Sequence, residues 1–312
     1  MFTLAHLSDS HVTPVRIPGL LPMLNKRVFG WLKWTFQRSK IHRPEVVTAL
    51  LDDLRSMQPD HVAITGDLTN LGFEEEFQAA GVWLRQLGDR QFISLIPGNH
   101  DAYIPIPWHA AWRHWQDYLE SDAAAVLLPP KASFQDLADT YFPTVRRRGM
   151  TALVGVCTAH PVRAFRAGGT VGAPQLQRLD TILRELAGSG LCRIVLIHHP
   201  PTHSDRTLWR GLADSAELCA VLQKNGADLI LHGHAHKTLM TSLAGPQGAI
   251  PIVGVRSASD FGHKPNRVAQ YHLYRIEKEN GGELPPRFRF VMVTREYNTA
   301  TGRFQHVGEQ PL

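Results

Sequence analysis

Short apolar runs alternate with amphipathic stretches along the 312-residue chain. The runs predict strands at 2–7, 62–65, 92–96, 151–156, 194–197, 229–231 and 252–255. Apolar residues recur at helical spacing over 45–57 and 174–187, and a third helix near 213–225 is expected to end at Gly226. Segments 268–276 and 288–293 favour antiparallel strands. The pattern therefore predicts an α/β sandwich in which helices flank layers of sheet.

The composition places the chain among folded proteins. Hydrophobic residues make up 43% and charged residues 20%, which is enough apolar surface to form a large core. We expect one domain over 1–312, because no repeat or linker divides the sequence. No run of about 18 apolar residues predicts a membrane-spanning helix, and the N-terminus lacks the basic start of a signal peptide. Three widely spaced cysteines do not suggest a disulfide framework, so we expect a cytoplasmic protein.

The net charge of +5 comes from one region, which we call the basic segment (residues 14–44). Seven lysines or arginines and no acidic residue lie between positions 12 and 44. Apolar residues recur there at helical spacing, namely Leu21, Leu24, Val28, Trp31, Leu32 and Phe36. A basic amphipathic helix is typical of a membrane-surface element, and the alternative is that its apolar face packs on the core. If it serves only lipid contact, deleting 20–40 should spare hydrolysis of a small aryl phosphodiester.

Polar side chains follow five of the predicted strands. Each strand end carries one motif, in the order Asp9-Ser10-His11, Gly66-Asp67, Gly98-Asn99-His100-Asp101, His198-His199 and Gly233-His234-Ala235-His236. In α/β sheets, ligands bind beyond the carboxyl ends of the strands. We therefore expect these side chains to meet on one rim of the sandwich.

The donor types at this rim indicate a metal centre. Carboxylate, amide and imidazole donors without thiolate suit Mn, Fe or Zn. Seven donors exceed the need of one tetrahedral ion and predict two divalent ions: Asp9, His11, Asp67, Asn99, His198, His234 and His236. Two such ions form a clamp for phosphoryl chemistry. The glycines beside the donors, Gly66, Gly98 and Gly233, would let the backbone approach closely.

The ordered motifs D-x-H, GD, GNH[D/E], H and GH-x-H, from Asp9 to His236, resemble the calcineurin-like metallophosphoesterase superfamily. The resemblance implies a four-layered α/β/β/α sandwich with a dinuclear centre. It assigns Asp9, His11, Asp67 and His236 to one ion, and Asn99, His198 and His234 to the other, with Asp67 bridging. His198 is preferred to His199 because the family ligand lies two residues before the proline. Ser10 departs from the aliphatic residue that is common there.

The expected reaction is hydrolysis of a phosphodiester or pyrophosphate bond by metal-activated hydroxide. His100, beside Asn99, is the candidate general acid or stabiliser of transition-state charge. Asp101 either orients the His100 imidazole or caps a turn. Arg210 lies between the last two metal motifs and is a candidate phosphate contact. A metal-free scaffold of this fold is disfavoured, because every ligand position is filled.

The substrate is suggested by a second resemblance. The NKR-x-x-G-x-x-x-W pattern from Asn25 to Trp34 is similar to a branch that hydrolyses the pyrophosphate of UDP-2,3-diacylglucosamine. We expect a small-molecule or lipid-linked phosphoester as substrate. The resemblance implies the lipid-linked one and peripheral contact with the inner face of the membrane, with a soluble cyclic-nucleotide phosphodiesterase as the rival. Trp108, Trp112 and Trp115 either line an acyl pocket or pack in the core. Nucleic acid is a weaker candidate, because nothing like the capping domain of repair nucleases follows the last motif.

Overall fold

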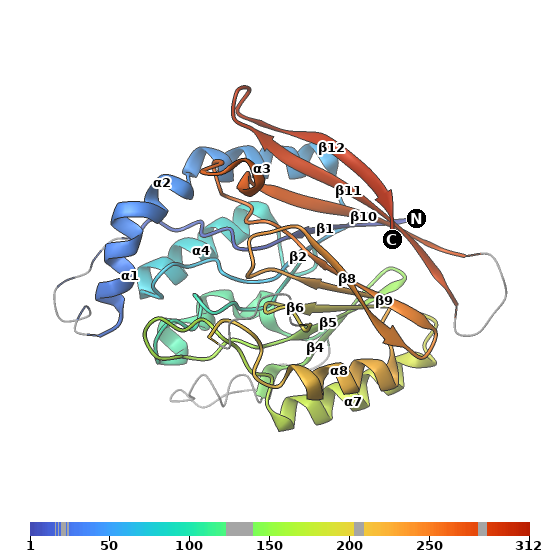
Figure 1. Ribbon diagram of the computed structural model, residues 1–312. Coiled ribbons are helices and arrows are strands. Elements are labelled where there is room, and N and C mark those ends of the chain that lie inside the picture. The colour runs from blue at the N-terminus through green and yellow to red at the C-terminus, as the bar shows by residue number, and fades with distance from the viewer. Residues whose placement is uncertain are drawn as a thin grey trace.

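Two sheets packed face to face form the centre of the molecule, with helices on both outer faces (Figure 1). The computed structural model describes residues 1–15, 17, 19, 23, 25–122, 140–202, 209–279 and 286–312. Within these residues the first sheet has the order β12-β11-β10-β1-β2-β3 and the second has the order β4-β5-β6-β7-β9-β8. The strands are β1 Phe2–Leu7, β2 His61–Ile64, β3 Ile93–Leu95, β4 Thr144–Arg148, β5 Thr151–Val156, β6 Cys192–Ile197, β7 Leu229–His232, β8 Leu239–Gly245, β9 Gly248–Gly254, β10 Gln270–Lys278, β11 Phe288–Asn298 and β12 Arg303–Pro311.

The inner strands of each sheet are parallel. Strands β1, β2 and β3 run the same way, as do β5, β6, β7 and β9, whereas β4, β8, β10, β11 and β12 pair antiparallel. The carboxyl ends of the parallel strands therefore lie at one edge of each sheet, where a common site can form.

Four long helices cover the sandwich. Helices α3 (Pro44–Met57) and α4 (Glu74–Leu87) lie outside the first sheet, and α7 (Ala173–Ala187) and α8 (Ser215–Asn225) lie outside the second (Figure 1). The described residues also form the short helices α1 (Arg27–Lys33), α2 (Ser39–Ile41) and α5 (Gln116–Leu119). This arrangement confirms the predicted four-layered α/β/β/α sandwich.

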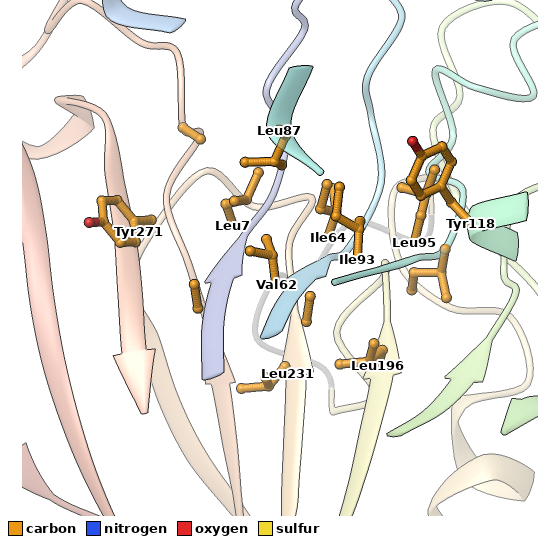
Figure 2. Packing of buried hydrophobic residues seen from close by; sticks show 14 of the residues in the cluster. Leu7, Val62, Ile64, Leu87, Ile93, Leu95, Tyr118, Leu196, Leu231 and Tyr271 are labelled. Carbon is orange, nitrogen blue, oxygen red and sulfur yellow. The ribbon is translucent and has the colours of Figure 1, made fainter. Parts of the chain in front are cut away.

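The main apolar cluster joins the two sheets and continues from the first sheet to helices α3 and α4. Figure 2 shows Leu7 and Ile64 of the first sheet with Leu87 of α4, and it also shows Leu196 and Leu231 of the second sheet. These side chains are almost completely buried. A second cluster joins the outer face of the second sheet to α7 and α8. Burial of this much apolar surface is the main force that holds the layers together.

Most predicted elements form close to their expected bounds. Strands 2–7 and 151–156 match residue for residue, and Gly226, with φ +78°, follows the end of α8 as expected. Helix α4 and strands β4, β8 and β12 were not predicted. Strand β8 is mostly exposed and β12 has an almost entirely exposed, polar sequence, so neither carries the apolar run on which strand prediction relies.

The three tryptophans after the GNHD motif belong to the core. Trp108, Trp112 and Trp115 are buried in the main apolar cluster, on two short 3-10 turns. The indole N–H of Trp112 donates to the Asp101 carbonyl at 2.9 Å, and that of Trp115 donates to the Phe77 carbonyl at 2.8 Å. The acyl-pocket alternative is therefore wrong for these residues, because all three rings are buried in the core and the N–H groups of Trp112 and Trp115 are already engaged.

The basic segment forms α1, a π-helical turn η2 (Trp34–Arg38) and α2. Trp31 and Trp34 pack against a small cluster that contains Leu71 and Phe73. Three other apolar side chains remain exposed, at 50% for Phe29, 42% for Leu32 and 70% for Phe36. Part of the apolar face of this segment therefore packs on the protein, and the rest of it is exposed. Leu21 and Leu24 lie outside the described residues.

No helix in the described part of the chain is long and apolar enough to cross a bilayer.

Candidate active site

The strand ends at the rim turn through an uncommon backbone conformation. Five of the seven candidate ligands have a positive φ, with values of 52° at Asp9, 39° at His11, 58° at Asp67, 65° at His234 and 50° at His236. Left-handed backbone is uncommon for residues with a Cβ and clusters at functional sites. The sharp turns place side chains from separate strands on the same rim.

The structure brings the seven predicted donors together. Donor atoms of Asp9, His11 and His236 lie within 4.8 Å of one another, as do those of Asp9, Asp67 and His198. The Asn99 side chain joins the remaining histidines, because its Oδ1 is 3.1 Å from His198 Nε2 and 2.8 Å from His234 Nδ1.

Backbone carbonyls fix the orientation of two of these imidazoles. His11 Nδ1–H donates to the Thr69 carbonyl at 2.8 Å, and His198 Nδ1–H donates to the Thr65 carbonyl at 2.6 Å. Burial lowers the pKa of both histidines below the ordinary value, so both are neutral near pH 7. Each Nε2 therefore carries a lone pair directed at the rim. A hydrogen bond from the other ring nitrogen to a backbone carbonyl is a usual feature of metal-binding histidines.

The neighbouring His199 is differently engaged. Its Nδ1 accepts from the Thr158 hydroxyl at 2.7 Å and its Nε2–H donates to the Ala167 carbonyl at 3.0 Å. Although His199 lies near His198 and His234, both of its ring nitrogens are used. This favours His198 as the ligand of the adjacent pair.

The two rim carboxylates are buried close together. Burial, and then the charges of Asp9 and Asp101, raise the pKa of Asp67. Burial alone would also raise the pKa of Asp9, but His236 holds it well below its ordinary value. His234 Nε2 is buried and lacks a hydrogen-bond partner among the described residues. Crowded carboxylates beside neutral imidazoles and an unpartnered donor atom are what a divalent cation would stabilise, so the residues fit the implied metals.

Small residues make this crowding possible. A Cβ on Gly98 would lie 2.6 Å from Asp67 N and 2.7 Å from His198 Cε1, and one on Gly233 would lie 2.6 Å from Asp9 Oδ2. Gly66 has φ +93° and approaches Gly98. The expected role of these three glycines is confirmed, because a side chain at any of them would displace a neighbour.

His100 and Asp101 have separate partners. The His100 imidazole is oriented by the Asn70 carbonyl, which lies 2.5 Å from its Nδ1. The Asp101 carboxylate accepts instead from backbone N–H groups of Gly98, Asp67, Leu68 and Thr69, and from the Thr69 hydroxyl. Asp101 therefore holds the Asp67 loop against the GNHD turn, as the turn-capping alternative describes, and does not orient His100.

Two further residues lie beside the candidate ligands and were not predicted as site residues. Arg38 Nη2 lies 3.0 Å from His11 Nε2, and Arg38 Nη1 lies 3.0 Å from His100 Nε2. The His42 ring lies 4.5 Å from that of His11, and its Nδ1 is 2.8 Å from Ser259 Oγ. Both come from the basic segment, where the absence of acidic residues was the only available signal.

A cavity of about 710 Å³ opens over the rim. Asp67, Asn99 and His234 line its floor, and eight lysines and arginines but only two aspartates line it among the described residues. Arg210 is one of the eight. Two exposed rings, Phe29 and Phe165, also line the cavity and lie 5.2 Å apart. The site therefore combines a cationic wall with an apolar edge.

The sequence is similar to that of known phosphoesterases. A family model described as calcineurin-like phosphoesterase matches residues 2–238. A probable cyclic nucleotide phosphodiesterase from Synechococcus sp. (strain WH7803) is 28% identical over 209 residues, which cover 64% of this chain and 68% of that protein. The glycerophosphodiester phosphodiesterase GpdQ from Enterobacter lignolyticus (strain SCF1) is 34% identical over 98 residues, 31% of this chain and 29% of that protein.

The fold is found again in a solved structure. A dimetal phosphatase from Danio rerio superposes with a TM-score of 0.65 at 12% identity, covering 99% of this chain and 98% of that chain. The chain belongs to the calcineurin-like phosphoesterase family. It is a metal-dependent phosphoester hydrolase that uses divalent metal ions and acts on a small phosphoester.

Proposed function

We propose that the enzyme hydrolyses the pyrophosphate of a lipid-linked nucleotide such as UDP-2,3-diacylglucosamine. The observation that carries the proposal is the cavity, whose cationic wall meets exposed apolar side chains at one edge. A nucleoside diphosphate joined to acyl chains would fit this cavity. Its anionic phosphates can pair with the lysines and arginines of the wall, and its acyl chains can contact the apolar side chains at the edge.

Of five exposed apolar side chains, Phe29 and Phe165 line the cavity, and the other three are next in sequence to residues that line it. Phe29, Leu32 and Phe36 come from the basic segment, while Phe165 and Trp209 come from two other segments and are 84% and 55% exposed. Isolated apolar side chains on a surface are ordinary, but a group of aromatic rings beside lysines is typical of lipid-facing surfaces. We propose peripheral contact with the inner face of the membrane through this group.

The metal ligands are proposed as Asp9, His11, Asp67 and His236 for one ion and Asn99, His198 and His234 for the other, with Asp67 bridging and Mn²⁺ as the first ion to test. When bound, two divalent ions activate water and neutralise phosphate charge. The histidines contribute neutral Nε2 or Nδ1 donors, and the aspartates supply the negative charge that the ions compensate. We further propose that 1–312 is one domain with 14–44 as an insertion, since β10–β12 complete the sheet that begins with β1.

His100 is proposed to lie beside the reacting phosphate, as its place among the cavity-lining residues supports. Its Nδ1 is committed to the Asn70 carbonyl, so the nitrogen that would face a substrate is Nε2, which lies 3.0 Å from Arg38 Nη1. Arg210, on the cavity wall, is proposed to contact a phosphate oxygen. Asp101 contributes by holding the loops that carry Asp67 and Asn99.

A cyclic-nucleotide phosphodiesterase is the second candidate. It is favoured by the 28% identity to the probable cyclic nucleotide phosphodiesterase from Synechococcus, which extends over 209 residues. The cationic wall suits a cyclic phosphodiester equally well, but such a substrate leaves the exposed apolar edge without a role.

The test is a Mn²⁺-supplemented assay that compares UDP-2,3-diacylglucosamine in detergent, followed by UMP release, with cyclic AMP in parallel. UMP release at a rate well above that for cyclic AMP is the expected result. Cleavage of cyclic AMP alone would overturn the lipid proposal in favour of the second candidate. Activity with neither would reject both substrates, while bis(p-nitrophenyl) phosphate serves as the control for an intact centre.

The membrane contact is tested with vesicles of phosphatidylglycerol and phosphatidylcholine. The double variant Phe36→Ser/Phe165→Ser should lose co-sedimentation with the anionic vesicles, because it removes the two most exposed aromatic rings among the described residues. Val307→Ser is the matched control, since Val307 is 44% exposed on β12. Equal sedimentation of all three proteins would reject the proposed contact.

A further inference from the structure

The guanidinium of Arg38 reaches the centre from outside the strand-end motifs. Arg38 is the last residue of the π-helical turn η2 and lines the same cavity as Asp67 and Asn99. Its Nη2 donates to His11 Nε2 at 3.0 Å and its Nη1 donates to His100 Nε2 at 3.0 Å. The basic segment thus places a permanent positive charge between two of the site motifs.

Two neighbouring carbonyls make both imidazoles hydrogen-bond acceptors. His11 Nδ1–H donates to the Thr69 carbonyl, and His100 Nδ1–H donates to the Asn70 carbonyl. Each neutral ring therefore presents the lone pair of its Nε2, and a guanidinium has only N–H groups to offer. In both hydrogen bonds, therefore, Arg38 is the donor and the histidine nitrogen is the acceptor.

These acceptors are unusual partners for a recessed arginine. A guanidinium binds carboxylate or phosphate oxygens most strongly, through two parallel hydrogen bonds. Among the described residues Arg38 forms no ion pair with a carboxylate, and its hydrogen-bond contacts are ring nitrogens of His11 and His100. Arg146, by contrast, is fully buried and satisfied by four backbone carbonyls. Arg38 is therefore a cation on the cavity wall that forms no ion pair within the described part of the chain.

The nitrogen of His11 that accepts from Arg38 is also a candidate metal ligand. His11 Nε2 is the atom that the ligand assignment directs at a metal ion, and one lone pair cannot both bind a metal and accept from Arg38. Binding of the metal would therefore release the Nη2 group. A released guanidinium N–H needs another acceptor, because leaving it unpaired in a recessed site costs free energy.

We propose that Arg38 is a catalytic residue that binds an oxygen of the phosphate undergoing hydrolysis, and that occupation of His11 by metal frees it for this role. The inference deepens the phosphoester hydrolase activity and applies to any diester or pyrophosphate, so it stands or falls separately from the lipid substrate. It also reverses one expectation: deletion of 20–40 removes Arg38 and should therefore impair hydrolysis of a small aryl phosphodiester as well.

The test compares Arg38→Met and Arg38→Lys with Lys40→Met, an exposed lysine of the same segment that does not line the cavity. Calorimetry measures the affinity for Mn²⁺ and then, on the Mn²⁺-loaded protein, for orthophosphate. For Arg38→Met we expect Mn²⁺ affinity equal to or tighter than that of the parent, and orthophosphate affinity weaker by about 10- to 100-fold. The orthophosphate affinity of Arg38→Lys should lie between those of the parent and Arg38→Met, because a single ammonium replaces the forked N–H groups of the guanidinium. The kcat/KM for bis(p-nitrophenyl) phosphate should follow the orthophosphate affinity.

Two outcomes overturn the proposal. Unchanged orthophosphate affinity in Arg38→Met would show that Arg38 does not bind phosphate. Loss of Mn²⁺ affinity together with a lower melting temperature would show that Arg38 only supports the structure of His11 and His100. If Arg38→Met does not fold, the decision rests on Arg38→Lys, whose orthophosphate affinity must fall while its Mn²⁺ affinity and melting temperature stay unchanged.

Discussion

The carboxylate of Asp101 accepts a hydrogen bond from the backbone N–H of Asp67 at 2.8 Å, although the two residues lie 34 positions apart. The same carboxylate also accepts from Gly98 N–H at 2.9 Å. The loop after β2 and the loop after β3 are therefore joined through one side chain, and the candidate ligands Asp67 and Asn99 are held as a unit.

Asp101→Asn tests this joint. The amide keeps one oxygen but turns an NH₂ group toward backbone N–H donors, so some hydrogen bonds are lost and others become repulsive. We expect a loss of about 1–3 kcal/mol in the free energy of unfolding and weaker Mn²⁺ binding. Urea unfolding and calorimetry measure the two effects. Loss of turnover with unchanged stability and Mn²⁺ affinity would instead assign Asp101 a direct part in the reaction.

Asp67→Asn tests the metal centre itself. Removing the charge of the carboxylate proposed to bridge should abolish stoichiometric binding of the second Mn²⁺ and reduce turnover of bis(p-nitrophenyl) phosphate to background. Metal content after gel filtration and steady-state kinetics give the answer. Asp52→Asn is the control, because the Asp52 side chain is 70% exposed on α3. Full activity of Asp67→Asn would contradict a dinuclear mechanism.

Gly98→Ala tests the close approach behind the ligands. The new methyl group would come within 2.7 Å of both Asp67 N and His198 Cε1, so the backbone or the ligands must move. We expect Mn²⁺ affinity to weaken by about 10- to 100-fold, as for other changes that displace metal ligands. Gly188→Ala is the matched control, since nothing lies within 4 Å of a Cβ there. Equal Mn²⁺ affinity of the two variants would show that the rim tolerates the shift.

Acid should destabilise the protein through buried histidines. Burial, and then the charges of Arg148 and Arg146, lower the pKa of His61 to about 3. Between the ordinary pKa of about 6.5 and that value, the unfolded chain binds a proton that the folded protein does not, so stability falls as the pH falls.

From pH 7 to pH 5, His61→Gln should therefore lose about 1–2 kcal/mol less stability than the parent. Urea unfolding at the two pH values measures the difference. His306→Gln, at an exposed position on β12, should behave like the parent. The same pH dependence in all three proteins would rule out His61 as a source of acid sensitivity.

Much of the site was accessible from the sequence, because its residues follow strands with clear apolar patterns. The rule that ligands meet beyond the carboxyl ends of parallel strands placed Asp9, Asp67 and His198 on one rim before the sheet order was known. The sequence did not predict whether Trp112 lies in the core or in a pocket, since spacing alone does not show which surface a turn faces. The role of Arg38 was also hidden, because a π-helical turn does not follow the 3.6-residue period by which faces of a helix are assigned.

The left-handed backbone at five of the candidate ligands limits what substitution can achieve at this rim. Among residues with a Cβ, Asn, Asp and His are several-fold enriched at positive φ, and they are also the residue types found at the seven donor positions. A β-branched residue would therefore be strained there before any question of coordination arises. The choice of ligand chemistry in this chain is thus made jointly by the metal and by the turn, and a redesign for a different ion would have to rebuild the strand ends as well as the side chains.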